Sequence, residues 1–432
     1  MGKLRAALLL ILPTVTSLVG VGIALLTSRG QWPVGDAWIV LLAALIMAPV
    51  VASITLRVIV PGFDLILVAV SAMVSCIGAS TLFLLASTSG TGQPFYGAIA
   101  MRHGLFVVAG FVAMVIGAAL AHRVDQIKMY PFTLLGLALL LTTVTVIFGE
   151  TVNGARLWLR FGPIQFQPSE IARLLLAGFM ASYLYERRHL VAGPWRVRTM
   201  DFPPAPYLLP LIGAVLSAVA ILMLQNDLGM AALVVLGAFA TVAGIVTSKS
   251  SIGAASTFLA IAAVSSFTAS ARVRDRVSGW LDPWRDPAGS GFQFVQADYS
   301  LASGGLLGYE GATPALSVPE IHTDFVLVGV ASQFGWTGSL AVLVLAGILV
   351  SRCALKSLQA PDGMRSLLAF SLTALIGIQL ILITGGTLRV LPLTGLTFPL
   401  LSYGGTSMVA TMFALGIVAG LGAPPAGRVI PF

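Results

Sequence analysis

Long apolar runs, one after another, constrain this chain more than any other feature of its sequence. A transmembrane α-helix needs about 20 mostly apolar residues to cross the hydrocarbon core of a bilayer, and runs of that length recur along the chain. Only 9% of the 432 residues are charged, whereas soluble domains carry roughly 25%. The sequence therefore predicts an all-α, polytopic membrane protein rather than a soluble one.

About twelve spans are expected, and no stretch between them is long enough to form a separate soluble domain. We expect one integral membrane domain over residues 1–432, with spans near 6–27, 37–57, 63–86, 103–121, 130–149, 167–185, 206–224, 228–247, 252–270, 323–350, 366–386 and 401–422. The first run follows basic residues as a signal peptide does. It is interpreted as an uncleaved helix, because it is too long and lacks a small-residue cleavage site.

The distribution of basic residues predicts the orientation. With the N-terminus in the cytoplasm, fourteen Lys and Arg residues fall on the inner side and the remaining ten on the outer side, as the positive-inside rule favours. The net charge of +8 is explained by these short loops and gives no reason to expect nucleic-acid binding. The longest loop, residues 271–322, then lies outside the cytoplasm. Seven of the sixteen acidic residues occur between Asp275 and Asp324.

Four polar segments interrupt the apolar pattern, and the alternation of the loops puts all of them on the outer side. The first runs from Asn153 to Arg173. Pro168 and Glu170 indicate a helix start, and Arg173 can pair with Glu170 one turn later. Spacing alone favours interfacial anchoring with a structural ion pair. The alternative is a cationic mouth for a phosphate-bearing lipid, because Arg presents a planar fork to phosphate oxygens.

The second and fourth segments break helices. Gln225–Gly229 is too short for a real loop, and it fits equally well a site or a tight turn in which Asn226 and Asp227 cap the next helix. Pro392–Ser407 is rich in prolines and glycines that interrupt a helix. It predicts a re-entrant or cavity-lining segment, because non-helical backbone at membrane depth is tolerated mainly where it is buried or lines a cavity.

The third segment is the long loop itself. Glu320, His322 and Asp324 near its end could form an acid–base or metal set, but their spacing matches no known ligand pattern, and Thr323 with Asp324 could simply cap the next helix. The loop also contains "WLDPWRDPAGSGFQ", with Asp282 and Asp286 each before a proline. The residues alone favour a turn-forming role for both carboxylates. The two cysteines and four scattered histidines suggest neither a disulfide nor a zinc site.

Seven motifs together resemble the SEDS family of bacterial shape, elongation, division and sporulation proteins, typified by RodA and FtsW. They occur in the family's order and span roughly residues 130–425: "NGARLWL", "FQPSEIAR", "QNDLG", "LDPWRDPAGSGFQFVQ", "SGGLLG", "PEIHTDF" and "PLTGLTFPLLSYGGTS". The chain resembles a divergent member, closer to RodA.

The resemblance implies a SEDS-type, GT-C-like fold and an inverting peptidoglycan glycosyltransferase. Such an enzyme polymerises lipid II into glycan strands at the outer face of the bacterial cytoplasmic membrane, for cell shape, elongation or division. It works with a class B penicillin-binding protein, a transpeptidase, and holds the growing undecaprenyl-pyrophosphate-linked glycan. Family members typically have ten spans, so we expect extra N-terminal helices within residues 1–60.

Site residues follow from the same resemblance. Asp286 is expected to be the general base that takes the proton of the acceptor hydroxyl, while Asp282 need not be catalytic. Gly289 and Gly291 would let the loop approach a sugar closely. Glu170 and Asp227 would orient the cationic groups or hold a divalent cation, Mg²⁺ or Mn²⁺. The expected substrate contacts are Arg156, Glu170, Arg173, Asp227, Gln296, His322 and Ser402.

The sequence also departs from the family's pattern. Ser332 and Gln333 stand where a pair of glutamates is common, Arg173 replaces a lysine, and Thr387 and Arg389 occupy a segment that often holds asparagines. A lipid II flippase and a catalytically inactive scaffold for a penicillin-binding protein are therefore alternatives. An ion-coupled transporter is disfavoured, because its charged residues would be expected near the bilayer midplane.

Overall fold

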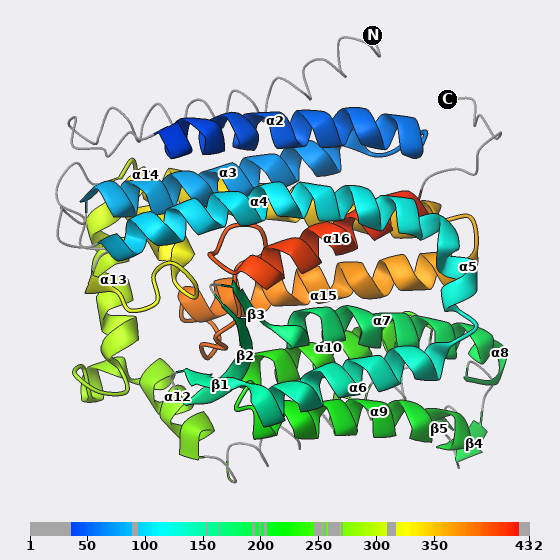
Figure 1. Cartoon of the computed structure of the whole chain (residues 1–432). Helices are drawn as coiled ribbons and strands as arrows, with labels where there is room; N and C mark the ends of the chain where they lie inside the picture. Colours follow the sequence, from blue (N-terminus) through cyan, green and yellow to red (C-terminus); the bar gives the residue numbers. More distant parts are fainter. Residues whose placement is uncertain are drawn as a thin grey trace.

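Helices aligned along one direction make up most of the computed structural model (Figure 1). The structure describes residues 36–88, 94–152, 154–162, 164–191, 195–197, 200–202, 205–245, 271–308 and 317–422, with isolated residues between 253 and 268. The aligned helices are α2 (Asp36–Ile59), α3 (Leu65–Thr88), α4 (Pro94–Leu120), α6 (Pro131–Phe148), α7 (Pro168–Glu186), α9 (Ala205–Leu224), α10 (Leu228–Ala243), α14 (Val326–Gln359), α15 (Gly363–Thr387) and α16 (Gly405–Leu421).

Each predicted span that falls within the described ranges corresponds to one of these helices. The spans predicted at 6–27 and 252–270 lie outside those ranges, apart from isolated residues of the second. Among the described helices, seven are long and apolar enough to cross a membrane. The boundaries differ most at α4, which begins at Pro94 rather than at residue 103, and at α14, which ends at Gln359 rather than at residue 350. α16 begins at Gly405 rather than at residue 401, because the preceding segment is irregular.

The predicted helical membrane fold is confirmed, and two small β-sheets that the sequence did not predict accompany the helices. The strands β1 (Glu150–Val152), β2 (Ala155–Phe161) and β3 (Ile164–Phe166) form an antiparallel sheet in that order. Glycines with positive φ, Gly154 and Gly162, stand at its two turns. A two-stranded sheet, β4 (Trp195–Val197) with β5 (Met200–Phe202), lies at the other end of the helices (Figure 1).

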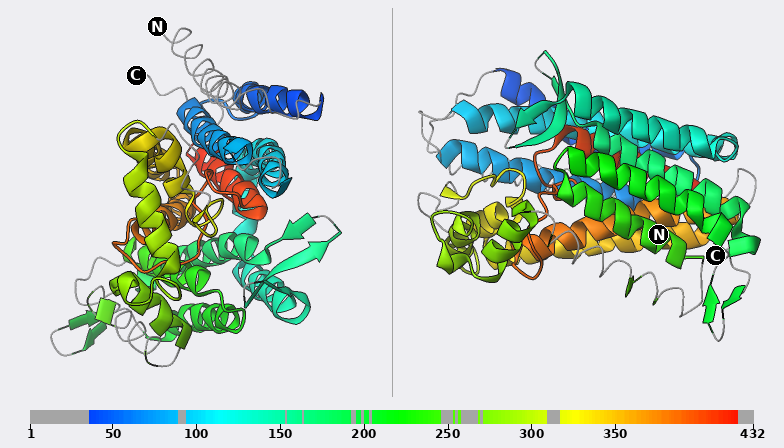
Figure 2. Two further views of the ribbon diagram at one scale, coloured as in Figure 1. Left: turned by 90° about the vertical axis from the view of Figure 1, so that its left-hand side faces the viewer. Right: turned by 90° about the horizontal axis from the view of Figure 1, so that it is seen from below.

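The long loop contains helices of its own. α12 (Ala271–Leu281), the short 3-10 helix η2 (Pro283–Arg285) and α13 (Phe292–Gly304) lie at the same end as β1–β3 (Figures 1 and 2). The opposite end carries the 3-10 helix η1 (Ala121–Arg123) and the short helices α5 (Val124–Ile127) and α8 (Arg188–Val191). All four polar segments therefore share one end of the helices, as the alternation of the loops predicts.

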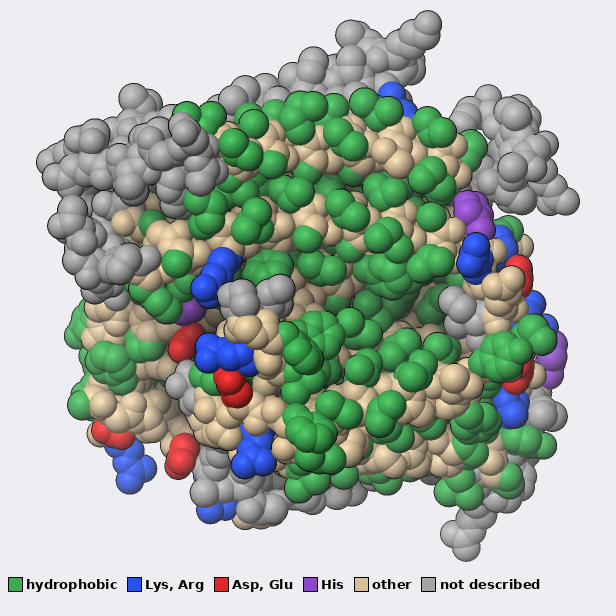
Figure 3. All heavy atoms as spheres, viewed as in Figure 1, with side chains coloured by type: hydrophobic (Ala, Val, Ile, Leu, Met, Phe, Trp, Pro, Cys, Tyr) green, Lys and Arg blue, Asp and Glu red, His purple; other side chains and the backbone are tan. Residues whose placement is uncertain are grey.

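The side chains on the surface follow the same division. Hydrophobic side chains cover much of the middle of the visible face, and charged ones gather toward the two ends of the helices (Figure 3). Many large apolar side chains along the helices are exposed, such as Val58, Leu140 and Leu340. Because a bilayer solvates such a band without cost, this pattern is that of helices crossing a membrane.

The innermost contact is that between α4 and α16, the most extensive pairing of two described elements. Added methyl groups at Gly117 and Gly416 would lie 2.3 and 2.0 Å from backbone oxygens of the facing helix. Small residues allow helix backbones to approach closely where no hydrophobic effect drives association. α16 is buried over most of its length.

α14 is broken at Gly335, whose φ of 68° and ψ of −173° are not helical. The turn after α13 fits against this break, because a methyl group at Gly335 would lie 2.2 Å from the Leu306 carbonyl oxygen. Two of the residues that depart from the family's pattern, Ser332 and Gln333, lie just before the break. Ser332 is buried and donates to the Gly329 carbonyl, whereas Gln333 donates to the Thr81 carbonyl of α3.

Candidate functional site

The first turns of α7 hold an ion pair that is almost completely removed from solvent. Pro168 begins the helix, and Arg173 Nη2 lies 2.7 Å from Glu170 Oε2, with side chains only 2% and 3% exposed. The predicted pairing is confirmed. Arg173 also donates to Gln379 of α15 and, over 3.3 Å, to Thr411 of α16. One cation thus joins three helices.

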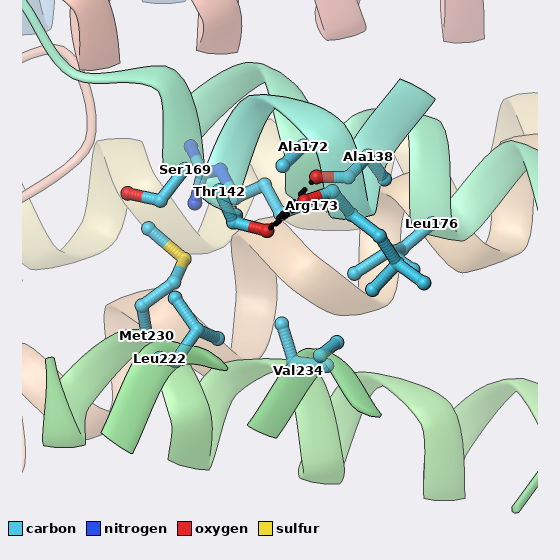
Figure 4. A pocket seen from close by; sticks show the side chains of 11 residues that line it. Ala138, Thr142, Ser169, Ala172, Arg173, Leu176, Leu222, Met230 and Val234 are labelled. Carbon is cyan, nitrogen blue, oxygen red and sulfur yellow. Dashed lines mark hydrogen bonds between the residues drawn. The ribbon is translucent and has the colours of Figure 1, made fainter. Parts of the chain in front are cut away.

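A small cavity lies beside this arginine, between α6, α7, α9 and α10 (Figure 4). Arg173, Ser169 and Thr142 contribute polar atoms, and apolar side chains such as Leu222 and Met230 face them. Its volume of about 10 Å³ is room for about one water molecule. The cavity is therefore too small for a sugar or a pyrophosphate. The Arg173 Nε is buried with no hydrogen-bond partner among the described residues.

Asp227 begins α10 and performs the capping role predicted for it. Its Oδ1 accepts from the Met230 N–H over 3.0 Å, whereas Oδ2 is buried with no hydrogen-bond partner among the described residues. Burial raises the pKa of Asp227 to about 6. The charge of Glu170 adds to the increase, and the Met230 N–H and Arg276 oppose it. The two carboxylates are thus electrostatic neighbours.

Arg276 of α12 is a member of this site that the sequence reasoning missed. Its Nη1 donates to the Thr394 carbonyl over 3.2 Å. A methyl group added at Gly395 would lie 3.7 Å from both Arg276 Nη2 and Asp324 Oδ2, so these two side chains flank Gly395. Burial raises the pKa of Asp324 to about 7, Glu320 adds to it, and Arg276 opposes it.

The residues 388–404 connect these pieces. As predicted, they are non-helical and largely buried from Leu396 onward. A methyl group added at Gly229 would lie 2.4 Å from the Thr394 carbonyl oxygen. The start of α10 therefore packs directly against this segment. Gln379 donates to the Thr397 carbonyl over 2.8 Å. The segment therefore contacts the partners of Arg173, the Asp227 cap and Arg276.

His322 and Ser402 tie the end of the long loop to the same segment. The Ser402 hydroxyl donates to the Thr323 carbonyl over 2.5 Å and accepts from the Phe398 N–H, so its one proton is already used within the protein. Tyr403 N–H donates to the His322 carbonyl. The His322 ring lies among the rings of Phe95, Tyr96 and Tyr403.

The contacts of Thr323 and Asp324 decide whether they cap the next helix. Neither Thr323 nor Asp324 is the N-cap of α14, because that residue is Phe325, whose side chain makes no capping hydrogen bond. Thr323 Oγ1 instead lies 3.2 Å from both the carbonyl and a carboxylate oxygen of Glu320. His322 Nε2 is 3.9 Å from Glu320 Oε2.

Asp286 is exposed and lies between η2 and α13. Its Oδ2 accepts from the Ser290 N–H over 2.9 Å, and its backbone oxygen accepts from Gly289 and Gly291. These bonds are those of the turn that its place before proline predicts. The nearby glycines are required by the loop itself, since a methyl group at Gly291 would lie 2.0 Å from the Pro283 oxygen.

Arg156 and Gln296 are more exposed than the Glu170–Arg173 ion pair. Arg156 is exposed on β2, and its guanidinium donates to Thr151 Oγ1 and to the Val146 carbonyl. Its backbone N–H donates to the Gln225 carbonyl over 3.0 Å, which attaches the sheet to the turn before Asp227. Gln296 is half-buried on α13.

A divalent cation has few protein ligands here. Within the described residues, no three His, Cys, Asp or Glu side chains are grouped so that they could hold a metal ion. Glu170 and Asp227 supply two carboxylates: Glu170 Oε2 is paired with Arg173, whereas Asp227 Oδ2 has no hydrogen-bond partner among the described residues. This donor set fits a cation such as Mg²⁺, which binds through one or two carboxylates and takes its remaining ligands from water and substrate phosphates.

Comparison with known proteins identifies the family. Residues 63–423 match the FtsW/RodA/SpoVE family of cell cycle proteins. The chain belongs to that family, the SEDS proteins. Peptidoglycan glycosyltransferase RodA of Mycobacterium tuberculosis is 34% identical over 270 residues, covering 62% of this chain and 57% of that protein. A probable peptidoglycan glycosyltransferase FtsW of Geobacter metallireducens is 31% identical over 366 residues, covering 82% and 93%.

Solved structures agree with this SEDS assignment. A chain of a peptidoglycan synthase complex that coordinates polymerization and crosslinking aligns with a TM-score of 0.67 and 30% identity, over 84% of this chain and 98% of that chain. RodA of Thermus thermophilus aligns with a TM-score of 0.58 and 26% identity, over 84% and 97%. As a SEDS protein, the chain is a multi-pass protein of the bacterial cell membrane.

Sequence reasoning could have found some of the partners that it missed. Gln379 and Thr411 are polar residues inside apolar runs, where each polar group needs a partner or a role. Arg276 lies in "ARVRDRVSGWL", an amphipathic stretch that folds as a helix. Thr394 and Gly395 lie within a motif already singled out, but only the fold shows that they meet Arg276.

Proposed function

We propose that the chain is a peptidoglycan glycosyltransferase that polymerises lipid II at the outer face of the cytoplasmic membrane. The observation that carries the proposal is the convergence of Glu170, Arg173, Asp227 and Arg276 around residues 388–404, at the end of the helices that also holds the long loop. Buried cations and carboxylates at one end of a membrane protein mark a site for a charged substrate.

The reaction joins two lipid-linked glycans. The 4-hydroxyl oxygen of the acceptor sugar forms a bond to the anomeric carbon of the growing glycan, and the bond from that carbon to the lipid pyrophosphate breaks. A base must take the hydroxyl proton, and positive charge must stabilise the departing pyrophosphate. Asp286 is the proposed base, since its exposed carboxylate is bound only within its own turn among the described residues.

The cationic side chains have different roles in this scheme. Arg173 is held by Glu170, Gln379 and Thr411, so it supplies a fixed positive charge rather than a mobile contact. Exposed Arg156 is better placed to reach the pyrophosphate of an arriving lipid. Bound Mg²⁺ or Mn²⁺ would add positive charge beside the phosphates, held by Asp227 with Glu170.

A class B penicillin-binding protein is the proposed partner. It would crosslink the strands that this chain polymerises. The similarity to a chain from a complex that coordinates polymerization and crosslinking supports this pairing. The inactive-scaffold alternative draws on Ser332 and Gln333, which replace carboxylates beside the break in α14.

The deciding experiment supplies the purified protein with fluorescent lipid II, with and without its cognate transpeptidase, while penicillin blocks crosslinking. Wild-type protein is expected to give glycan ladders. Asp286→Ala is expected to abolish them, because the acceptor proton loses its base. Asp282→Ala, the matched exposed Asp–Pro step, is expected to retain them. Chelation followed by return of Mg²⁺ or Mn²⁺ tests the cation.

Three other outcomes would contradict the proposal. No polymer under any partner or cation condition would favour the scaffold. Transfer of lipid II across proteoliposomes, equal in wild type and Asp286→Ala and without polymer, would favour the flippase. Ladders that survive Asp286→Ala but vanish in Asp282→Ala would exchange the roles of the two carboxylates.

A further inference from the structure

Arg389 occupies a backbone conformation that arginine rarely adopts. It follows α15 with φ of 58°, and the N–H groups of Val390 and Leu391 donate to the Gly385 carbonyl. This left-handed position after a helix usually holds Gly or Asn, because a Cβ is unfavourable there. An arginine at such a position points to a function for its side chain.

Both the side chain and the backbone of Arg389 hold the long loop. Its Nη1 lies 2.5 Å from Asp298 Oδ2 of α13, and the two side chains are 29% and 30% exposed. Its carbonyl oxygen accepts from the Trp280 indole N–H of α12 over 2.9 Å. One residue therefore contacts the helix on each side of the Asp286 turn.

The turn at Arg389, which follows α15, is also attached to the buried part of the site. The Thr387 hydroxyl lies 3.3 Å from the Asp324 carbonyl oxygen. Five residues beyond Arg389, the Thr394 carbonyl accepts from Arg276 and packs against Gly229. Movement at Arg389 would therefore change how α12 and α13 lie relative to Asp227 and the Arg173 network.

We propose that Arg389 is a positioning residue that, through Asp298 and Trp280, fixes the Asp286 turn over the buried charges at the ends of α7 and α10. The inference rests on the proposed glycosyltransferase function. Arg389 touches no reacting group. It acts by placing the exposed base at a fixed distance from the cations, because a misplacement of about 1 Å can reduce a rate by roughly a hundredfold.

The test uses the full-length protein with its transpeptidase partner. Arg389→Asn removes the ion pair and keeps a residue that tolerates positive φ. We expect kcat for polymerisation to fall about tenfold or more, with KM for lipid II changed less than twofold, because the substrate contacts remain. Asp298→Asn is expected to do the same. The charge exchange Arg389→Asp with Asp298→Arg is expected to restore most of kcat.

A second measurement does not depend on activity. Hydrogen–deuterium exchange of residues 271–308 is expected to increase in Arg389→Asn and Asp298→Asn, and to return toward wild type in the charge exchange. Arg365→Gln is the control, because Arg365 pairs with Asp362 and Asp125 at the opposite end of the helices. It should change neither exchange in 271–308 nor kcat.

These measurements separate the two proposals. If wild-type protein makes no polymer while hydrogen–deuterium exchange of residues 271–308 responds as expected, the glycosyltransferase proposal is wrong. The structural clamp, in which Arg389 holds α12 and α13 through Trp280 and Asp298, is then still supported. If both single variants keep wild-type exchange and kcat, the clamp is wrong. Loss of kcat that the charge exchange does not restore, with exchange unchanged, would also overturn it.

Discussion

Glu170 and Arg173 form the residue pair whose energetics most constrain the site. Removing one partner of a buried ion pair leaves an uncompensated charge, which costs about 3–5 kcal/mol. Glu170→Gln is therefore expected to lower the free energy of unfolding by that amount, because Gln379 and Thr411 offer Arg173 only neutral oxygens. The measurement is thermal unfolding of the purified protein in detergent.

Glu150→Gln provides the matched control. Glu150 lies 3.6 Å from Arg160 on β1–β2, with both side chains about half exposed. Exposed pairs contribute about 0–1 kcal/mol, so this variant should unfold close to wild type. Equal shifts in the two variants would mean that water reaches Arg173 and compensates its charge, contrary to the burial described above.

Among the structural elements, α14 contains a break whose backbone conformation depends on one glycine, Gly335. Gly335→Ala would place a side chain at φ of 68° and 2.2 Å from the Leu306 oxygen, so the turn after α13 must move. We expect a loss of about 1–3 kcal/mol and a lower unfolding temperature. Gly347→Ala in the same helix has open space around the new methyl group and should be neutral or stabilising, because Ala favours helix. Equal effects would contradict the close contact.

A feature can be predicted from the sequence when the residues that determine it lie close together along the chain. Apolar runs locate the aligned helices, and local spacing predicts the Glu170–Arg173 pair and the Asp227 cap. The strands β1–β3 are missed, because three short strands at an interface carry little periodic signal. Gln379 and Thr411 join Arg173 from more than 200 residues away, and no local pattern encodes such a contact. The Arg389–Asp298 pair is missed for the same reason.

For the whole molecule, the orientation in the membrane decides whether the site can meet lipid II on the outer face. Exposed Gln165 of β3 lies at the site end, whereas exposed Gln126 of α5 lies at the other end. The native Cys76 and Cys353 are buried, so background labelling is expected to be low. Gln165→Cys in intact spheroplasts should react with a membrane-impermeant maleimide. Gln126→Cys should react only after permeabilisation.

The opposite labelling pattern would have consequences beyond topology. It would place Asp286, Arg156 and the buried charges on the cytoplasmic side, where polymerised glycan could not join the cell wall. The positive-inside rule favours the expected pattern, because the spans predicted from the sequence put fourteen basic residues on the cytoplasmic side and ten on the outer side. Charge distribution and helix direction thus lead to one testable arrangement, in which the end of the helices that carries η2, α13 and the starts of α7 and α10 faces outward, where the proposed substrate lipid II would meet it.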